Sequence, residues 1–361
     1  MNISILGATG SIGRQTINVA RALGIKVKAI AAGHDRKALE ELAQIVKPDM
    51  AVLYEESGME GLLECAGLPD VQLVVNAMVG SIGLKPTMAA IAAKKDIALA
   101  NKETLVAAGP LVMAAARTNG VEIRPIDSEH SAIWQCLQGN DKSQVKKLIL
   151  TASGGAFRTW DKDALFRATA ADALRHPVWN MGKKITIDCA TMMNKGLEYI
   201  EAHFLFDIPY EKIEILIHPQ SVIHSMVEYK DGAVISQMAS PDMEQPIQYA
   251  LCAPSRPARN HASLDFLTAG PLTFEAPDFE RFPCLALTMA AAKTGGTMPA
   301  MVNALNEKLT AAFLGGSIGF YDISQLIEKA MASYTVKPLT SVSDVEEAEA
   351  WAVEFYSKKL C

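Results

Sequence analysis

The sequence predicts an α/β protein with three parts: an N-terminal Rossmann-like, doubly wound sheet, a central α+β domain and a C-terminal helical bundle. Three observations predict this class. Short apolar strands alternate with helically spaced segments over residues 1–126, a glycine-rich turn joins the first strand to the first helix, and residues 279–361 contain four helical segments. Strands that alternate with helices are joined by crossovers and therefore run parallel.

The N-terminal elements follow from the spacing of apolar residues, which is continuous in the strands and helical between them. The expected strands are Asn2–Leu6, Lys26–Ala32, Met50–Tyr54, Val71–Ala77, Ile97–Ala100 and Val121–Ile126. The expected helices are Ser11–Leu23, Arg36–Val46, Met59–Ala66, Pro86–Lys94 and Thr104–Asn119. We assign residues 1–126 to the first domain.

The pattern changes after residue 146. An apolar segment, Lys147–Thr151, precedes a second set of expected strands at Gly182–Ile187, Ile213–Ile217, Ser225–Tyr229 and Ala233–Met238. The proline-rich residues 251–278 are typical of a connector. The expected final helices are Cys284–Lys293, Pro299–Leu314, Ile323–Tyr334 and Val345–Lys358, the last with a capping box of Ser343 and Glu346. We therefore expect a second, α+β domain over 127–250, a connector over 251–278 and a helical domain over 279–361.

Composition excludes several classes of protein. A net charge of −6 over 361 residues argues against a general nucleic-acid binder, which needs a clustered basic surface. No apolar run reaches the roughly 18 residues of a membrane span. The six cysteines form no C-x-x-C pair, which favours reduced, mostly buried thiols. The chain starts directly on strand-like sequence, so we expect a cytoplasmic protein that binds neither membrane nor nucleic acid.

The turn Gly7–Gly13 has the pattern G-x-x-G-x-x-G between a strand and a helix. Glycines let backbone N–H groups approach a pyrophosphate at a helix N-terminus, although a tight turn without a ligand is the alternative. Nucleotide selectivity is read after the second strand, at Gly33–Lys37. Arg36 and Lys37, with His34, suit a 2′-phosphate, whereas Asp35 suits a ribose hydroxyl. This segment alone leaves NAD and NADP open.

Two polar segments follow the later strands. Lys102, within Asn101–Glu103, can stabilise developing negative charge, and a solvated turn is the alternative. Asp127 and Glu129 lie two apart after the last strand, so their carboxylates can converge on one hard cation. Capping of the next helix by Asp127 or Ser128 is the alternative that the triplet alone favours. Glu198 is the candidate third carboxylate.

The central region offers an anion site and a lid. Lys195 supplies charge, Asn194 a neutral donor and Ser153 a hydroxyl beside two glycines, and an ordinary turn and helix surface is the alternative. Residues 174–182 form a loop with Trp179, of the kind that often closes over a site. His218 and His224 are interpreted as structural histidines.

These motifs together resemble one family. GATGSIG, NKE, DSEH, SGG, HPVWNMG, ATMMNKGLE and IHPQSVIHSMV occur in the order found in 1-deoxy-D-xylulose 5-phosphate reductoisomerases, and the match runs from Met1 to about Pro246. The resemblance implies a homodimeric enzyme that rearranges and reduces 1-deoxy-D-xylulose 5-phosphate to 2-C-methyl-D-erythritol 4-phosphate for isoprenoid synthesis. It implies NADPH and Mg²⁺, Mn²⁺ or Co²⁺ as cofactors. It also implies that residues 1–126 form the NADPH-binding domain, that 127–250 form the catalytic, metal- and substrate-binding domain, and that 279–361 form the C-terminal helical domain.

The resemblance also assigns residues. The metal ligands would be Asp127, Glu129 and Glu198, which are catalytic together with Lys102 and His176. The substrate would contact Ser128, Glu129, Ser153, His176, Trp179, Cys189, Asn194, Lys195 and Glu198. The cofactor would contact Thr9, Gly10, Ser11, Ile12, Gly33, His34, Asp35, Arg36, Asn101, Lys102, Glu103, Gly182 and Met243.

Two residues depart from the family pattern. Cys189 stands where the family usually has a serine that donates to the phosphate, and a thiol is a weaker donor. Asp35 stands where the family usually has asparagine, and it would repel a 2′-phosphate.

Two rival functions are a cysteine-dependent semialdehyde dehydrogenase, which needs an activated thiol, and a non-enzymatic dinucleotide sensor.

Overall fold

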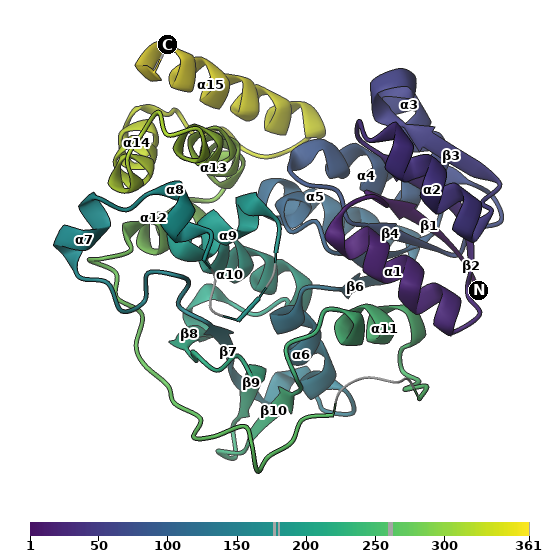
Figure 1. Cartoon of the computed structure of the whole chain (residues 1–361), viewed down its shortest axis with the longest axis horizontal. Coiled ribbons are helices and arrows are strands. Elements are labelled where there is room, and N and C mark those ends of the chain that lie inside the picture. Colours follow the sequence, from purple (N-terminus) through teal and green to yellow (C-terminus); the bar gives the residue numbers. More distant parts are fainter. Residues whose placement is uncertain (176–177, 180, 259–262, 361) are drawn as a thin grey trace. The chain divides into compact units, whose positions relative to one another are not determined.

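The computed structural model describes residues 1–175, 178–179, 181–258 and 263–360 (Figure 1). Contacts divide the chain into two compact units. Unit 1 contains Met1–Thr104, Val112–Trp134 and Asp242–Ser263, and unit 2 contains Leu105–Leu111, Gln135–Pro241 and Leu264–Cys361. The domain boundaries expected at 126, 250 and 278 stay predictions.

Unit 1 is built on a six-stranded parallel sheet with the order β3-β2-β1-β4-β5-β6. Its strands are β1 Asn2–Leu6, β2 Lys26–Ala32, β3 Met50–Leu53, β4 Leu73–Asn76, β5 Asp96–Leu99 and β6 Ile123–Pro125. The strand order reverses between β1 and β4. In an open α/β sheet, ligands bind at the carboxyl ends of the strands beside such a reversal. The predicted Rossmann-like sheet is confirmed.

Helices cover this sheet and supply its core. They are α1 Ser11–Ala22, α2 Arg36–Val46, α3 Tyr54–Gly67, α4 Leu84–Ala92 with the preceding 3₁₀ turn η1 Ser81–Gly83, α5 Glu103–Asn119, α6 Ser128–Leu137 and α11 Glu244–Cys252. Helices α5 and α6 each contribute residues to both units. Ile5 of β1, Val19 of α1 and Ile247 of α11 are fully buried in one hydrophobic cluster. The segment after residue 241 therefore packs on the cofactor sheet.

Unit 2 contains a four-stranded mixed sheet with the order β10-β9-β7-β8, in which only β7 and β8 pair in parallel. Its strands are β7 Val145–Ala152, β8 Ile213–Ile217, β9 Ile223–Tyr229 and β10 Val234–Met238. Its helices are α7 Lys162–Phe166, α8 Ala170–Ala173, α9 Lys183–Ala190, α10 Met193–Phe206, α12 Pro283–Thr294, α13 Met298–Leu314, α14 Phe320–Ser333 and α15 Val342–Leu360, with 3₁₀ turns η2 Lys142–Gln144 and η3 Tyr210–Lys212. The four final helices are as predicted.

One predicted strand is wrong. Residues 183–187 belong to helix α9, and Gly182 precedes it with extended backbone angles. Alternating Ile and Thr residues suggested a strand, but the buried residues Thr186, Ile187 and Ala190 lie on one face of a helix that packs against α10 and α13. Tertiary packing overrides a local β preference here.

The predicted capping box before the last helix is also wrong by two residues. Helix α15 begins at Val342, and Asp344 Oδ2 accepts hydrogen bonds from the backbone N–H groups of Thr340 and Ser341, both at 2.8 Å. A hydrogen bond from the Thr340 hydroxyl, together with these two backbone bonds, lowers the pKa of Asp344 to about 2. In the described part of the chain, no helix has both the length and the apolar character that a membrane crossing requires.

Candidate functional site

The glycine turn after β1 is shaped for close approach by a ligand. Gly7 has a φ of +84°, and a Cβ there would lie 2.4 Å from the carbonyl oxygen of Ala77. A Cβ at Gly13 would lie 2.3 Å from the Gly7 oxygen. Gly10, the N-cap residue of helix α1, provides no side-chain cap, which leaves the first N–H groups of the helix for an anion. The turn therefore fits a dinucleotide pyrophosphate.

The selectivity segment after β2 is exposed from Gly33 to Lys37. Asp35 caps helix α2, because its Oδ1 accepts the Ala38 N–H at 3.0 Å. Arg36 forms ion pairs with Glu56 and, at 3.6 Å, with Glu40. Asp35 thus has a structural use, independent of any nucleotide, that favours an acidic or amide residue at this position.

The segment after β5 is buried, unlike a solvated turn. Lys102 is 6 % exposed, and its Nζ lies 2.5 Å from Asp127 Oδ2. Asn101 Nδ2 lies 2.9 Å from Glu103 Oε2. Asn101 and Glu103 are buried as well, so the carboxyl end of β5 presents a compact polar cluster.

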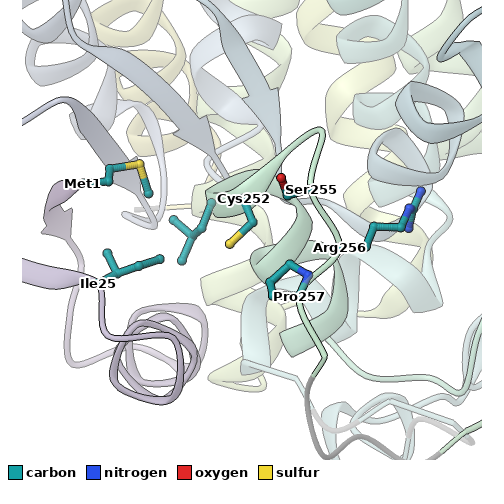
Figure 2. Close-up of a pocket in the computed structure, with 7 residues that line it drawn as sticks. Met1, Ile25, Cys252, Ser255, Arg256 and Pro257 are labelled. Atoms are coloured by element: carbon teal, nitrogen blue, oxygen red, sulfur yellow. The ribbon is translucent and has the colours of Figure 1, made fainter.

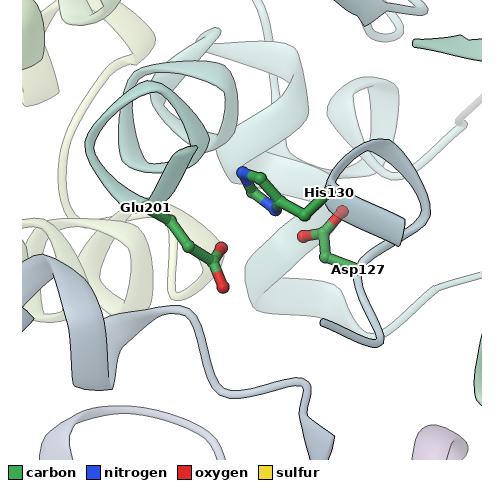
Figure 3. Close-up of side chains that lie close together, drawn as sticks. All are labelled: Asp127, His130 and Glu201. Carbon is green, nitrogen blue, oxygen red and sulfur yellow. The ribbon is translucent and has the colours of Figure 1, made fainter. Parts of the chain in front are cut away.

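Asp127 follows β6, just before helix α6. Its backbone oxygen accepts the Ser131 N–H at 2.8 Å, while its carboxylate pairs with Lys102. Burial by itself would raise the pKa of the Asp127 carboxyl, but the charges of Lys102 and His130 outweigh burial and hold that pKa well below its usual range. Figure 3 shows Asp127 and His130 at the start of α6. Asp127 is therefore an anion at neutral pH, as a cation ligand must be.

Glu129 lies in the first turn of α6, where Ser128 Oγ donates to its Oε2 at 2.5 Å. Asp127, Ser128 and Glu129 all belong to unit 1, and Glu198 belongs to unit 2. The three-carboxylate metal site stays a prediction. Glu201, also labelled in Figure 3, is a fully buried acid on α10 of unit 2 that no sequence motif indicated.

Helix α10 of unit 2 carries a buried charge pair. Lys195 Nζ lies 2.5 Å from Glu198 Oε2, and Asn194 Nδ2 donates to Glu198 Oε1 at 2.6 Å. The two charged side chains are only 4 % and 1 % exposed. Gly196 lets this helix approach α12, since a Cβ there would lie 2.6 Å from Thr288 Cβ. The helical spacing brings these three residues together. Because their side chains are buried, this segment is not an ordinary solvent-exposed helix surface, which was the alternative interpretation.

A glycine turn after β7 lies beside the end of α9. Ser153 Oγ accepts the Gly155 N–H at 3.2 Å. Gly155 has a φ of +69°, and a Cβ there would lie 2.4 Å from the Cys189 carbonyl oxygen. The predicted phosphate residues Ser153 and Cys189 thus belong to neighbouring segments of unit 2.

The remaining predicted residues lie in different settings. His176 lies outside the described residues. The Trp179 ring centroid is 6.0 Å from that of His224. Met243 precedes α11 and packs against the core of unit 1. His218 is structural as predicted, because its Nε2 accepts the N–H groups of Val222 and Ile223 at 3.2 Å.

A pocket of about 480 Å³ lies elsewhere on unit 1 (Figure 2). Its lining residues include Met1, Ile25, Leu251 and Cys252. Met1 and Ile25 precede β1 and β2, so the pocket lies at the amino edge of the sheet, opposite the glycine turn. None of the predicted site residues lines it.

The fold and these clusters define a class of protein. A parallel sheet with a pyrophosphate turn at its reversal point, and with buried lysine and carboxylate groups after β5 and β6, is the architecture of a dinucleotide-dependent oxidoreductase. The cysteine-dependent rival is not favoured, because burial raises the pKa of Cys136 to about 11, whereas a nucleophilic thiol needs a lowered value.

The chain belongs to the 1-deoxy-D-xylulose 5-phosphate reductoisomerase family. The family model of that name matches residues 3–60 and 55–109, and two models of its C-terminal domains match 123–206 and 238–355. Reductoisomerases of Acetivibrio thermocellus and Heliobacterium modesticaldum are 52% and 51% identical, over 97% and 99% of this chain and 97% of each relative. The predicted family and enzyme class are confirmed.

Solved structures of reductoisomerases have the same fold as this chain. The reductoisomerase of Zymomonas mobilis in complex with NADPH has a TM-score of 0.91 at 42% identity, and it covers 99% of this chain and 98% of its own. A DOX-P reductoisomerase in complex with NADPH, fosmidomycin and magnesium has a TM-score of 0.94 at 36% identity, and it covers 99% of both chains. The predicted fold, NADPH and divalent cation are confirmed for this family.

Proposed function

We propose that this chain converts 1-deoxy-D-xylulose 5-phosphate to 2-C-methyl-D-erythritol 4-phosphate in isoprenoid precursor synthesis, with NADPH and a divalent cation. The observation that carries this proposal is the buried Lys195–Glu198 pair on α10. A buried ammonium and a buried carboxylate in one helix turn suit a substrate that carries a phosphate and needs a cation.

Asp127, Glu129 and Glu198 would hold the cation. All three offer carboxylate oxygens, which Mg²⁺ and Mn²⁺ prefer. When bound, the cation supplies Lewis-acid polarisation of the substrate's oxygens. The lowered pKa of Asp127 keeps one ligand charged at every physiological pH.

The substrate phosphate would meet Ser153, Cys189, Asn194 and Lys195, with His176 nearby. The Ser153 turn lies against Cys189, and Asn194 and Lys195 follow on the next helix. Because the phosphate is remote from the reacting carbons, its binding orients them without taking part in the chemistry. Trp179 would cover the bound substrate and keep water out.

Ser128 and Lys102 would contact the oxygen-bearing carbons. One carbon–carbon bond breaks and a different one forms, by retro-aldol and aldol steps, so that the linear carbon chain becomes branched. Lys102 would stabilise the negative charge that develops on oxygen. The resulting aldehyde then accepts a hydride from NADPH, which leaves as NADP⁺.

A spectrophotometric assay tests this function directly. NADPH consumption is followed with 1-deoxy-D-xylulose 5-phosphate, before and after thorough chelation, and with Mg²⁺ or Mn²⁺ restored. We expect turnover that stops on chelation and returns with the metal. Turnover that survives chelation, or NADPH binding without turnover, would contradict the proposal and favour the rival functions.

The first prediction concerns Cys189. Replacing Cys189 with Ser should lower KM for the sugar phosphate by about two- to tenfold, because a hydroxyl is the stronger donor. Cys136→Ser is the control, since this buried thiol lies on α6, outside the proposed phosphate site. A KM for the Cys189→Ser enzyme that equals or exceeds the parent's would refute this role.

The second prediction concerns cofactor choice. We expect kcat/KM with NADPH to exceed that with NADH by at least about tenfold, because charge-assisted bonds to a 2′-phosphate come from exposed His34, Arg36 and Lys37. Arg36→Met should reduce this ratio, and Arg21→Met, an exposed arginine at the end of α1, should not. Equal or better use of NADH by the parent enzyme would overturn the assignment.

The third prediction concerns a homodimer. Among the described residues β10 pairs only with β9, and it exposes Val234 and Ile235 by 50% and 39%. An apolar edge strand invites pairing with a second copy. Ile235→Lys should shift the particle mass toward the monomer in light scattering, whereas Val353→Lys, equally exposed on α15, should leave it unchanged. A monomeric parent chain would contradict the proposal.

The proposed compartment is the cytosol. Five cysteines lie in the described part of the chain, and all are free thiols. Reduced thiols are the normal state in that compartment.

A further inference from the structure

Asn76, at the carboxyl end of β4, is fully buried and was not singled out by its sequence. Its Nδ2 donates to the Gly83 oxygen at 3.1 Å and to Thr87 Oγ1 at 2.8 Å, and its Oδ1 accepts the Met78 N–H at 3.2 Å. Both amide hydrogens and the amide oxygen are therefore used inside the protein.

Asn101, after the neighbouring strand β5, also holds this segment. Its Nδ2 lies 3.0 Å from the Met78 oxygen and 2.9 Å from the Gly80 oxygen. Its Oδ1 accepts a hydrogen bond from the Thr104 hydroxyl at 2.5 Å. Asn76 and Asn101 thus fix residues 77–80, which we name the β4 loop, and neither amide group needs a ligand to be satisfied.

The β4 loop lies directly against the pyrophosphate turn. A Cβ at Gly7 would be 2.4 Å from the Ala77 oxygen and 3.0 Å from the Met78 nitrogen. The Ala77 N–H also donates to the Leu6 oxygen at 2.8 Å. The β4 loop therefore borders the turn on the side of β1 where β4 lies.

Strand order indicates which half of the cofactor this wall faces. Strand β1 has β2 on one side and β4 on the other. In this class of fold the adenosine ribose is read after β2, so the nicotinamide half extends toward β4. Val79 in the β4 loop is 70% exposed, and it offers an apolar side chain there.

We propose that Asn76 and Asn101 are positioning residues that fix the β4 loop as the wall of the site for the nicotinamide half of NADPH. This inference rests on the proposed dinucleotide site at Gly7–Gly13. The Asn101 side chain would then act on the cofactor indirectly, through the β4 loop, and not by direct contact. Asn76 and Val79 become two further functional residues.

Two ligands separate the halves of the cofactor. NADP⁺ spans the whole site, whereas 2′,5′-ADP carries only the adenosine half and its phosphates. Binding of each is measured by calorimetry to the full chain. Asn76→Ala should weaken NADP⁺ by about tenfold and change the affinity for 2′,5′-ADP by less than twofold, because only the nicotinamide wall has moved.

Thr87→Val is the matched control, because it removes one partner of Asn76 but keeps the bond to Met78. It should change NADP⁺ affinity by less than threefold. Val79→Ser keeps the test decisive if Asn76→Ala does not fold, since an exposed side chain contributes little to stability. It should weaken NADP⁺ by at least threefold and leave 2′,5′-ADP unchanged.

Three results would overturn the inference. Equal losses for both ligands in Asn76→Ala would indicate general damage to the domain. Unchanged NADP⁺ binding in Val79→Ser would mean that the β4 loop does not face the nicotinamide half. A parent chain that binds neither ligand would refute the proposed site at Gly7–Gly13 itself, which is a distinct outcome.

Discussion

Replacing Glu198 with Gln is expected to reduce turnover by about 1,000-fold, on the scale of groups that organise charge in the transition state. The substitution keeps the size of the side chain and removes one negative charge and one oxygen. The lost oxygen is either the acceptor of Lys195 at 2.5 Å or the acceptor of Asn194 at 2.6 Å. The substitution therefore changes two proposed roles of Glu198 at once: its role as a cation ligand, and its role as the partner of Asn194 and Lys195, which would bind the phosphate.

Binding measurements separate these two effects. Mn²⁺ affinity, followed by electron paramagnetic resonance, should fall strongly in Glu198→Gln. Affinity for inorganic phosphate should be kept, because Lys195 retains its charge. Glu214→Gln is the control, since it removes a charge from an exposed carboxylate of unit 2 that pairs with Lys147. Unchanged Mn²⁺ affinity in Glu198→Gln would refute the ligand assignment.

The same variant should lose stability. Removing one partner of a buried ion pair costs about 3–5 kcal/mol, because the other charge stays buried. The double variant Lys195→Met, Glu198→Gln should recover part of that loss in thermal unfolding and none of the activity. Recovered activity would show that Glu198 only balances Lys195.

The regular elements could be predicted because each has a simple period. Strands β1 and β2 begin and end at the predicted residues, since each is a short, mostly apolar segment followed directly by a glycine, a pattern typical of a buried strand. Residues 183–187 were misassigned because the face of α9 is defined by contacts with α10 and α13, which are distant in sequence. Helix α11 was not predicted for the same reason.

The parts of the site that could be predicted are those whose residues lie close together in the sequence. Asn194, Lys195 and Glu198 lie within four residues on one helix, so their proximity follows from helical geometry. The ion pair of Lys102 with Asp127 depends on the neighbouring positions of β5 and β6, which no local pattern contains. Asn76 resembles an isolated polar residue at the end of an apolar strand, and only its hydrogen bonds to Met78 and Gly83 reveal a role.

Replacing Lys102 with Met is expected to lower kcat by about 100- to 1,000-fold, the usual cost of losing one group that stabilises developing charge. The ammonium lies 2.5 Å from Asp127 in a buried setting, where electrostatic interactions are weakly screened. Because Lys102 competes with a cation for Asp127, its loss should leave Mn²⁺ affinity unchanged or tighter. The loss of kcat should therefore not be accompanied by a loss of metal affinity.

Lys95→Met is the matched control for this prediction. Lys95 is also a buried lysine of unit 1, 9% exposed, and its Nζ donates to the Pro69 oxygen at 2.8 Å. It precedes β5, whereas Lys102 follows it, so the two lysines lie at opposite edges of the same sheet. Lys95→Met should cost stability and keep kcat. If Lys102→Met instead loses Mn²⁺ affinity in proportion to kcat, Lys102 acts by holding Asp127 in place, and its proposed contact with the substrate is wrong.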